Sequence, residues 1–291
     1  MYDIIIIGAG PAGLTAAIYA LRANKKVLII EAKNYGGQII NAHKIDNYPG
    51  LPHISGFDYA TSVYNQVMDL GGKIVYETVN LITPDKKVTT NKNTYQSKAI
   101  IIATGAVNKK LNIPNEKELL GKGVSYCATC DGNFYKNKIV VVNGEEHHAL
   151  SDALYLTDIA STVYLITDKN DFSENAKMID ELKKKNVKII LNSKITSING
   201  QEKLESITIN NNEEIKTDGL FIAIGLAPAN DKFANCVDIT KDGYIKSDDG
   251  YHTKSPGIYV AGDARDKMLR QLTTAVGDGA NAAVIAIKEM E

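Results

Sequence analysis

The first 31 residues constrain the fold more than any other part of this chain of 291 residues. An apolar run over 2–7 leads directly into Gly8-Ala9-Gly10-Pro11-Ala12-Gly13, which completes a G-x-G-x-x-G pattern. Helix-forming residues follow over 14–23, and a second apolar run over 27–30 ends at Glu31. This order of strand, glycine turn, helix, strand and acid is typical of a βαβ unit that binds a dinucleotide.

Each residue type in this unit has a mechanical reason. Gly8 permits the tight turn, Gly10 lets the backbone approach a pyrophosphate, and Gly13 lets the helix pack closely on the strand. The pyrophosphate would lie at the helix N-terminus, while Glu31 can accept a hydrogen bond from a ribose hydroxyl. Pro11 suits the first helical turn, where its missing donor has no intrahelical partner to lose. The alternative interpretation is a glycine-rich turn in a βαβ unit without a ligand.

The rest of the chain repeats this construction, and its length favours two domains. A buried strand over 99–102 ends in Ala103-Thr104-Gly105-Ala106, and 257–263 has a similar form. Between them, a strand over 138–142, a helix over 148–159 and a strand over 162–166 make a second βαβ-like unit. We therefore predict an α/β protein with two Rossmann-like, three-layer domains, the second inserted into the first. The predicted outer domain comprises 1–112 and 243–291, and the inserted domain comprises 113–242.

Composition excludes several classes of function. The net charge of −1 argues against nucleic acid as an electrostatic partner. The apolar run near the N-terminus is too short for a signal sequence, and no apolar run is long enough to span a membrane. Three cysteines do not make a secreted disulfide scaffold. These features predict a cytoplasmic protein.

Two of the three cysteines stand in Cys127-Ala128-Thr129-Cys130, followed at once by Asp131. Such a pair can form and open a disulfide, and the adjacent carboxyl group can move a proton to or from sulfur. If the pair opens a helix, the free N–H groups there lower the pKa of a thiol. Asp131 could also be a helix N-terminal charge without a catalytic role. A metal site would need a second pair of ligands, but Cys236 is isolated and is expected to be a small buried side chain.

Taken together, these motifs resemble those of the low-molecular-weight flavoprotein thioredoxin reductases. The resemblance covers nearly the whole chain, and it is carried by 8–13, Gly36-Gly37-Gln38, Asn47-Tyr48-Pro49-Gly50, 103–106, 123–132, Ala261-Gly262-Asp263 and Arg270-Gln271. It implies FAD in the outer domain, a homodimer, and thioredoxin or a similar small dithiol protein as the substrate.

The resemblance also implies roles for individual residues. In the family the second cysteine faces the flavin, so Cys130 should be the charge-transfer thiolate and Cys127 the thiol that attacks the substrate disulfide. Asp263 should hold the ribityl chain, with Arg270 and Gln271 along the flavin and Gln38 and Asn47 lining its pocket. The complete set of implied FAD-binding residues is Gly8, Gly10, Pro11, Ala12, Gly13, Glu31, Ala32, Gly36, Gly37, Gln38, Asn47, Val79, Ala103, Thr104, Gly105, Gly262, Asp263, Arg270, Gln271 and Leu272.

The inserted domain departs from the NADPH-dependent members of the family. Its glycine turn reads Asn143-Gly144-Glu145-Glu146-His147-His148-Ala149, and we align Asn143 and Glu145 with the first two glycines of the fingerprint. A side chain at the second position would crowd a pyrophosphate, and a carboxylate would also repel it. Two unit charges ~4 Å apart cost about 4 kcal/mol at an effective dielectric constant of about 20. The histidine pair could be a metal or proton-relay pair, or simply solvated or capping residues.

A second departure follows the strand over 162–166. The segment over 167–172 has no arginine cluster to hold a 2′-phosphate, although Asp168 could accept from the ribose of NADH. The chain therefore resembles most closely the ferredoxin-dependent flavin thioredoxin reductases, in which a flavin receives electrons one at a time. The alternatives are an NAD(P)H-dependent thioredoxin reductase with an atypical cofactor site, a flavin- or nucleotide-binding redox sensor, and a flavin enzyme that acts on a small substrate such as a peroxide or a low-molecular-weight disulfide.

Overall fold

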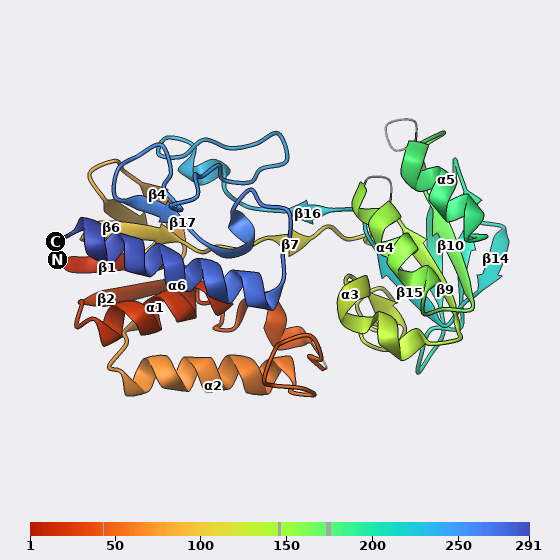
Figure 1. Ribbon diagram of the computed structural model, residues 1–291, viewed down its shortest axis with the longest axis horizontal. Helices are drawn as coiled ribbons and strands as arrows, with labels where there is room; N and C mark the ends of the chain where they lie inside the picture. The colour runs from red at the N-terminus through yellow and green to blue at the C-terminus, as the bar shows by residue number, and fades with distance from the viewer. Residues whose placement is uncertain (43, 145–146, 173–175) are drawn as a thin grey trace. The chain divides into compact units, whose positions relative to one another are not determined.

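The computed structural model describes residues 1–42, 44–144, 147–172 and 176–291. The chain forms two compact units, and Figure 1 follows it from one to the other. The outer unit comprises Met1–Val107 and Ala227–Glu291, and the inserted unit comprises Asn108–Leu226. Among the described residues, no helix combines the length and the apolar character needed to cross a membrane.

The outer unit is built on a mostly parallel sheet. Its strands are β1 (Tyr2–Ile7), β2 (Val27–Glu31), β3 (Ile74–Tyr76), β4 (Val79–Ile82), β5 (Lys87–Thr90), β6 (Thr94–Ile102) and β17 (Ile258–Val260). They lie in the order β3-β2-β1-β6-β5-β4, with β17 parallel to β6 and with antiparallel pairing only at β4, β5 and the start of β6. The helices are α1 (Pro11–Arg22), α2 (Gly56–Asp69) and α6 (Leu272–Glu289), with short helices η1 (Gly37–Asn41), η4 (Asp231–Phe233) and η5 (Gly262–Ala264).

The central strand β1 is buried on both faces. Ile4 and Ile6 pack into one hydrophobic core, together with residues of α1 and α6, while Ile5 and Ile7 pack into a second core on the opposite face. Successive side chains of a strand point to opposite faces, so a strand covered on both sides must be apolar throughout. This requirement explains why the sequence has four consecutive isoleucines there. Figure 1 shows α1 and α6 side by side along this sheet.

The inserted unit has a second parallel sheet in the order β11-β10-β9-β15-β8. Its strands are β8 (Val124–Ser125), β9 (Ile139–Asn143), β10 (Thr162–Ile166), β11 (Lys188–Ile190) and β15 (Gly219–Ile222). Its helices are α3 (Ala128–Asp131), η2 (Gly132–Tyr135), α4 (His147–Thr157) and α5 (Ala176–Lys184). A separate antiparallel sheet, which the sequence did not lead us to expect, comprises β12 (Ile195–Asn199), β13 (Ser206–Ile209) and β14 (Glu213–Lys216).

The predicted class of fold is confirmed, because each unit has a parallel, Rossmann-like sheet. The connections between the units differ from the predicted ones. The chain crosses at 107–108 and again at 226–227, where β7 (Val107–Asn108) and β16 (Leu226–Ala227) pair with each other. The second crossing comes before the predicted 243 because Phe233, Cys236 and Val237 are fully buried in the core that contains Ile5 and Ile7 of the outer unit.

Candidate redox site and cofactor cradle

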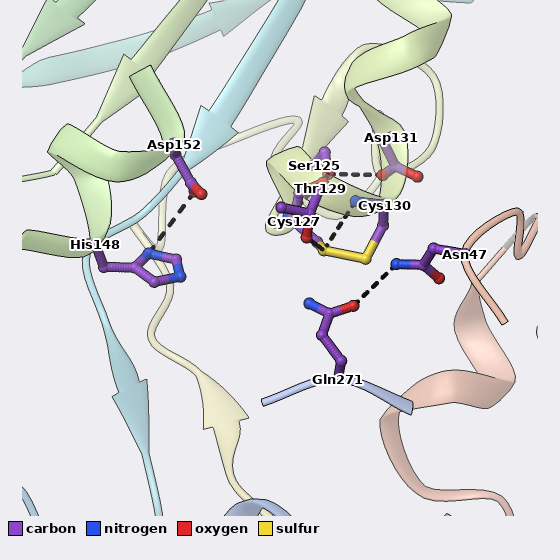
Figure 2. Close-up of a disulfide and its surroundings, with 9 residues drawn as sticks. All are labelled: Asn47, Ser125, Cys127, Thr129, Cys130, Asp131, His148, Asp152 and Gln271. Atoms are coloured by element: carbon purple, nitrogen blue, oxygen red, sulfur yellow. Dashed lines mark hydrogen bonds and ion pairs between the residues drawn. A yellow bond between two sulfur atoms is a disulfide. The ribbon is translucent and has the colours of Figure 1, made fainter. Parts of the chain in front are cut away.

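Cys127 and Cys130 form a disulfide at the start of α3, directly after strand β8 (Figure 2). Cys127 is the N-cap residue of α3, and the backbone N–H of Cys130 donates a hydrogen bond to Cys127 Sγ at 3.2 Å. The pair therefore does open a helix, which is the condition that our sequence analysis set for a stabilised thiolate. Because α3 has only four residues, the local N–H donor rather than a long helix dipole is the feature that would stabilise a thiolate at Cys127.

Asp131 is tied to the cysteine pair through Ser125, the last residue of β8. The Ser125 hydroxyl donates to Asp131 Oδ2 at 2.6 Å, and Ser125 Oγ accepts from the backbone N–H of Cys127 at 3.0 Å. The side chain of Ser125 is buried. Our sequence reasoning missed Ser125, because nothing in its sequence position indicates that α3 turns the chain back and brings Asp131 to it.

In the outer unit, the three glycines of the first fingerprint have different reasons to be glycine. A Cβ added to Gly8, whose φ is +112°, would lie 2.3 Å from the Ala103 carbonyl oxygen, and one added to Gly13 would lie 1.9 Å from the Gly8 carbonyl oxygen. A Cβ on Gly10 would meet nothing closer than Gly37 Cα, at 3.8 Å. Protein packing therefore requires Gly8 and Gly13 but not Gly10. The open space in front of Gly10, at the start of α1, fits the close approach of a ligand phosphate.

Glu31 lies at the end of β2, beside this turn. Its carboxylate accepts from the backbone N–H of Ala9 at 2.8 Å and from that of Lys33 at 2.8 Å. These bonds fix the carboxylate next to the turn, and Ala32 follows directly after β2. Gly36 continues the same region, since its N–H donates to the Ala9 carbonyl at 2.8 Å.

Asp263 and Arg270 each carry a buried polar atom that makes no hydrogen bond with the described residues. Asp263 Oδ1 and Arg270 Nε have no hydrogen-bond partner there, although Lys267 Nζ forms an ion pair with Asp263 Oδ1 at 3.5 Å. Burial raises the pKa of Asp263, and Lys267 opposes that effect. An unsatisfied buried polar group costs about 1–3 kcal/mol. Together with the space at Gly10, these two atoms fit a bound group rich in hydroxyl and carbonyl oxygens, as FAD is.

Asn47 and Gln271, two further predicted cofactor residues, form a hydrogen bond with each other. Asn47 Nδ2 donates to Gln271 Oε1 at 3.0 Å, and Figure 2 shows this contact. Gln271 is also the N-cap of α6, where its side chain and that of Thr274 form a capping box. Gln38 Nε2 donates to the Ala106 carbonyl at 2.8 Å. Each of these side chains is thus held by protein contacts.

The turn after β6, which contains Thr104 and Gly105, depends on a residue that sequence reasoning missed. Asn230 is fully buried, its Oδ1 atom accepts from the Thr104 hydroxyl at 3.0 Å, and its Nδ2 atom donates to the Gly243 carbonyl at 3.0 Å. No short-range pattern could indicate this contact, because 126 residues separate the partners.

The last predicted cofactor residues have mainly packing roles among the described residues. Gly262 N–H donates to Asp278 Oδ2 at 3.1 Å, and a Cβ there would lie 2.7 Å from that of Ala12. Val79 and Leu272 are buried, Val79 in the core with Ile5 and Leu272 in a smaller core around Tyr59.

A turn of the same construction follows β9 in the inserted unit. Gly8 N–H donates to the Ile30 carbonyl at 2.8 Å, and Gly144 N–H likewise donates to the Ile166 carbonyl at 3.1 Å. The helix begins three residues after the glycine in both units. Gly144, rather than Asn143, therefore occupies the place of the first glycine, and our sequence alignment of this turn was wrong by one residue.

The error has a physical cause. Asn143 is the last residue of β9 and is buried, and its Nδ2 atom donates to the Ile166 carbonyl at 3.0 Å. A polar residue thus stands where the first unit has Ile7. Counting from Gly144, the second fingerprint position falls on Glu146 and the third on Ala149. Glu146, like the Glu145 of our alignment, lies outside the described residues.

The same equivalence moves the position of the ribose-binding acid. β1 pairs Ile7 with Ile30, and β9 pairs Asn143 with Ile166, so the counterpart of Glu31 is Thr167 rather than Asp168. Thr167 is buried, and its Oγ1 atom accepts from the backbone N–H of Lys169 at 3.2 Å. Asp168 is 44% exposed and forms an ion pair with Lys194 at 3.7 Å.

The histidine pair begins α4. His148 Nδ1 lies 3.7 Å from Asp152 Oδ2, with the histidine side chain 61% exposed and the carboxylate buried. Burial raises the pKa of Asp152 to about 6, and His148 opposes that effect. Figure 2 shows His148 and Asp152 on α4, while the disulfide belongs to α3 of the same unit.

Comparisons with known proteins agree with these features. Residues 2–279 match the family described as pyridine nucleotide-disulphide oxidoreductases. A "34.2 kDa protein in rubredoxin operon" of Clostridium pasteurianum is 41% identical, over 98% of this chain and 96% of that protein. The thioredoxin reductase of Bacillus subtilis is 38% identical, over 97% and 93% respectively. The crystal structure of thioredoxin reductase from Streptococcus pyogenes has a TM-score of 0.94 and 37% identity, and covers 100% of this chain and 98% of its own.

The chain belongs to the pyridine nucleotide-disulphide oxidoreductase family. Within this family it falls among the low-molecular-weight flavoprotein thioredoxin reductases. It is therefore a flavoprotein disulfide oxidoreductase, and its cofactor is FAD.

Proposed function

We propose that this protein receives electrons one at a time from reduced ferredoxin and passes them, through FAD and the Cys127–Cys130 disulfide, to thioredoxin. The observation that carries the proposal is the glycine turn of the inserted unit. In this turn the first fingerprint glycine, which serves protein packing, is retained as Gly144, and the position that serves a ligand is changed.

The two turns make the distinction clear. A Cβ on Gly144 would lie 2.3 Å from the Ala223 carbonyl oxygen, as one on Gly8 would lie 2.3 Å from that of Ala103. Gly144 is thus required by packing alone. Gly10 has no packing reason to be glycine, and its counterpart by count is Glu146. A nicotinamide dinucleotide would bring its pyrophosphate to that position of the fingerprint, and two unit charges of like sign ~4 Å apart repel by about 4 kcal/mol at an effective dielectric constant of about 20. Since about 1.4 kcal/mol is a factor of ten in affinity, useful binding would be lost.

The second strand of the inserted unit supports the same conclusion. Thr167, not an acid, takes the place of Glu31, so the carboxylate that would accept from a ribose hydroxyl is missing there. The segment from 108 to 226 contains no arginine to hold a 2′-phosphate. The inserted unit has therefore lost the features that select NADH and those that select NADPH.

A one-electron protein donor needs none of these features. FAD, when bound, supplies a group that can take up electrons singly and pass them on as a pair. Two ferredoxins would deliver two electrons, and the disulfide would take up these electrons and two protons to become a dithiol.

Thioredoxin is the proposed acceptor because relatives that match nearly the whole chain are thioredoxin reductases. Cys127 attacks the thioredoxin disulfide to form a mixed disulfide, and Cys130 then resolves it. Asp131 moves the proton to or from the leaving sulfur. The predicted cofactor residues of the outer unit hold FAD. We further propose a cytoplasmic homodimer, whose mass light scattering would measure.

A second candidate is an NAD(P)H-dependent thioredoxin reductase with an unusual cofactor site. The description of the family as pyridine nucleotide-disulphide oxidoreductases favours it. The two candidates share the acceptor and the disulfide, so they differ only in the donor.

An anaerobic titration of the purified flavoprotein tests the donor. We expect reduced ferredoxin to bleach the flavin absorbance, and to do so catalytically when thioredoxin is added. Micromolar NADPH or NADH should leave the absorbance unchanged. A Cys127→Ser variant is the matched control, since its flavin should still be reduced by ferredoxin while thioredoxin reduction stops.

Rapid bleaching by a nicotinamide, with ferredoxin inert, would overturn the proposal in favour of the second candidate. Turnover of thioredoxin also separates an enzyme from a redox sensor. In a Cys130→Ser variant, a trapped mixed disulfide between Cys127 and thioredoxin would argue against a small molecule as the principal substrate.

A further inference from the structure

Ser125 has a hydrogen-bond arrangement that depends on the protonation state of its neighbour. Its hydroxyl lies 2.6 Å from Asp131 Oδ2 and 3.4 Å from the Cys127 carbonyl oxygen, and both are acceptors within its reach. Its oxygen accepts from the Cys127 backbone N–H at 3.0 Å. A serine hydroxyl has one donor and two acceptor sites. The single hydroxyl proton can therefore serve only one of its two acceptors at a time.

The choice between them follows the charge of Asp131. When Asp131 is ionised, the hydroxyl donates to the carboxylate, which is the closer and stronger acceptor. When Oδ2 carries a proton, the carboxyl group donates to Ser125 Oγ, and the hydroxyl proton turns to the Cys127 carbonyl. Ser125 Oγ then accepts two hydrogen bonds and donates one, which uses its full capacity. The buried serine thus supports both charge states of Asp131 without a change of geometry.

We propose that Ser125 is a positioning residue for the proton step of dithiol–disulfide exchange, because it holds Asp131 in place in both protonation states. The inference rests on the proposed role of Asp131 as proton donor and does not depend on the electron donor. Ser125 also fixes the backbone of Cys127, so the thiol that attacks and the acid that follows are held by one side chain.

The exchange reaction with a small disulfide shows at which step the position of the Asp131 carboxyl group matters. The Cys127 thiol gives its proton to Asp131 and attacks one sulfur of the reagent, and the new S–S bond forms as the disulfide bond of the reagent breaks. The departing sulfur takes that proton from Asp131 and leaves as a thiol. The Cys130 thiol then gives its proton to Asp131 and attacks Cys127 Sγ, which re-forms the intrachain disulfide, and the second sulfur takes this proton and leaves as a thiol. The two electrons and the two thiol hydrogens of the reduced pair end on two product thiols.

The need for an acid depends on the leaving group. An alkyl thiol, with a pKa near that of cysteine, leaves poorly as an anion, whereas an acidic aromatic thiol leaves without a proton. We therefore compare bis(2-hydroxyethyl) disulfide with 5,5′-dithiobis(2-nitrobenzoate) as oxidants of the holoprotein. The protein is first reduced with a phosphine and desalted under anaerobic conditions, so neither ferredoxin nor thioredoxin is involved.

For Ser125→Ala we expect the rate with the alkyl disulfide to fall about tenfold, a part of the roughly 10²–10⁴-fold that general acid catalysis contributes. The rate with the aromatic disulfide should stay within about twofold of the wild-type rate, and Ser125→Thr should restore the alkyl rate. Ser193→Ala is the matched control. Ser193 is also buried in the inserted unit, and its hydroxyl donates to the Leu191 carbonyl at 3.0 Å.

A double-mutant cycle tests whether Ser125 acts through Asp131. Adding Ser125→Ala to Asp131→Asn should cause no further loss with the alkyl disulfide. An equal loss with both oxidants, or the same tenfold loss in the Asp131→Asn background, would overturn the proposal. If Asp131→Asn alone leaves the alkyl rate unchanged, the proton role of Asp131 itself fails, and that result is distinct from failure of the donor assignment.

Discussion

At the scale of single residues, His252 holds the C-terminal helix of the outer unit by its charge. Its Nε2 atom lies 2.6 Å from Glu289 Oε1 on α6, and its Nδ1 atom lies 2.9 Å from Asp248 Oδ2. Tyr259 donates its hydroxyl proton to Glu289 Oε2 at 2.6 Å. The hydrogen bond to Glu289, followed by the contacts with Asp248, raises the pKa of His252. With a carboxylate at each ring nitrogen, the imidazolium form is the one that fits.

This arrangement predicts a pH-dependent stability. A raised pKa stabilises the folded state below the unfolded value of about 6.5, and the contribution disappears as the pH rises through the folded pKa. We expect His252→Gln to lower the free energy of unfolding by about 1 kcal/mol or less at pH 6, given the exposure of the groups, and by less at pH 9. Urea unfolding at the two pH values measures the difference.

His53→Gln provides the control, because His53 also contacts a carboxylate, Asp46, but is 70% exposed. It should have little effect at either pH. An equal loss of stability at pH 6 and pH 9 for His252→Gln would mean that the ring acts through packing and not through its charge.

Residue-level prediction from sequence succeeded for the disulfide, because its two cysteines stand only three positions apart. The proton role of Asp131, the next residue, stays a prediction. Ser125 and Asn230 could not be found in this way. Serine and asparagine are common, and their importance comes from partners that the fold supplies, six residues away for Ser125 and 126 residues away for Asn230.

At the scale of elements, two glycines of α6 offer a direct comparison. A Cβ on Gly279 would lie 2.1 Å from the Ala12 carbonyl oxygen of α1, whereas one on Gly277 would meet nothing within 4 Å. We expect Gly279→Ala to push α1 and α6 apart and to cost about 1–3 kcal/mol of stability. Gly277→Ala should instead add about 0.5–1 kcal/mol, because alanine loses less entropy in a helix.

Thermal unfolding of the two variants, each with FAD bound, measures both effects. The variants share one helix and one chemical change, so any general effect of added helix propensity appears in both. A loss of stability in Gly277→Ala comparable to that in Gly279→Ala would contradict the packing argument.

Helices and strands were predictable from sequence where their apolar residues follow a clear helical or strand pattern. The strands over 2–7 and 162–166 were predicted with the bounds that the structure has. The strand β9 runs one residue further than predicted because the buried amide of Asn143 replaces an apolar side chain. That single residue displaced our alignment of the following turn. The antiparallel sheet of β12, β13 and β14 consists of short strands that carry no comparable signal.

At the scale of the whole molecule, the hydrophobic cores of the described residues respect the division into units. Three cores consist only of outer-unit residues, and two consist only of inserted-unit residues. Each unit thus has its own hydrophobic core. The two points where the chain passes between the units, 107–108 and 226–227, lie together because β7 pairs with β16. We expect a chain with 1–107 joined to 227–291 by a short linker to fold and retain FAD.

The matched control is the deletion that the sequence alone would have suggested, which joins 112 to 243. It removes Phe233, Cys236 and Val237, each 0–1% exposed in the core of the outer unit. Losing such side chains costs about 2–5 kcal/mol each, which is comparable to the whole stability of a domain. Circular dichroism and flavin absorbance would compare the two deletions. Equal folding of both would show that the boundary at 226–227 has no energetic meaning.

The division into two domains followed from the repeated βαβ pattern, but the boundary between them did not. The segment over 227–242 has few regular elements, and only its buried side chains reveal its unit. Local sequence patterns predict a strand or a helix, whereas long-range packing decides to which unit a loop belongs.

The retained Gly144 has a consequence for how the sequences of such chains diverge. A packing glycine can be replaced only at the expense of the fold, so it remains after its ligand has gone. A ligand-facing glycine is free to vary as soon as the ligand is no longer used. In a genome survey of chains with this architecture, we therefore expect the residue two positions after the turn glycine to reveal the present electron donor, while the turn glycine itself records only common descent.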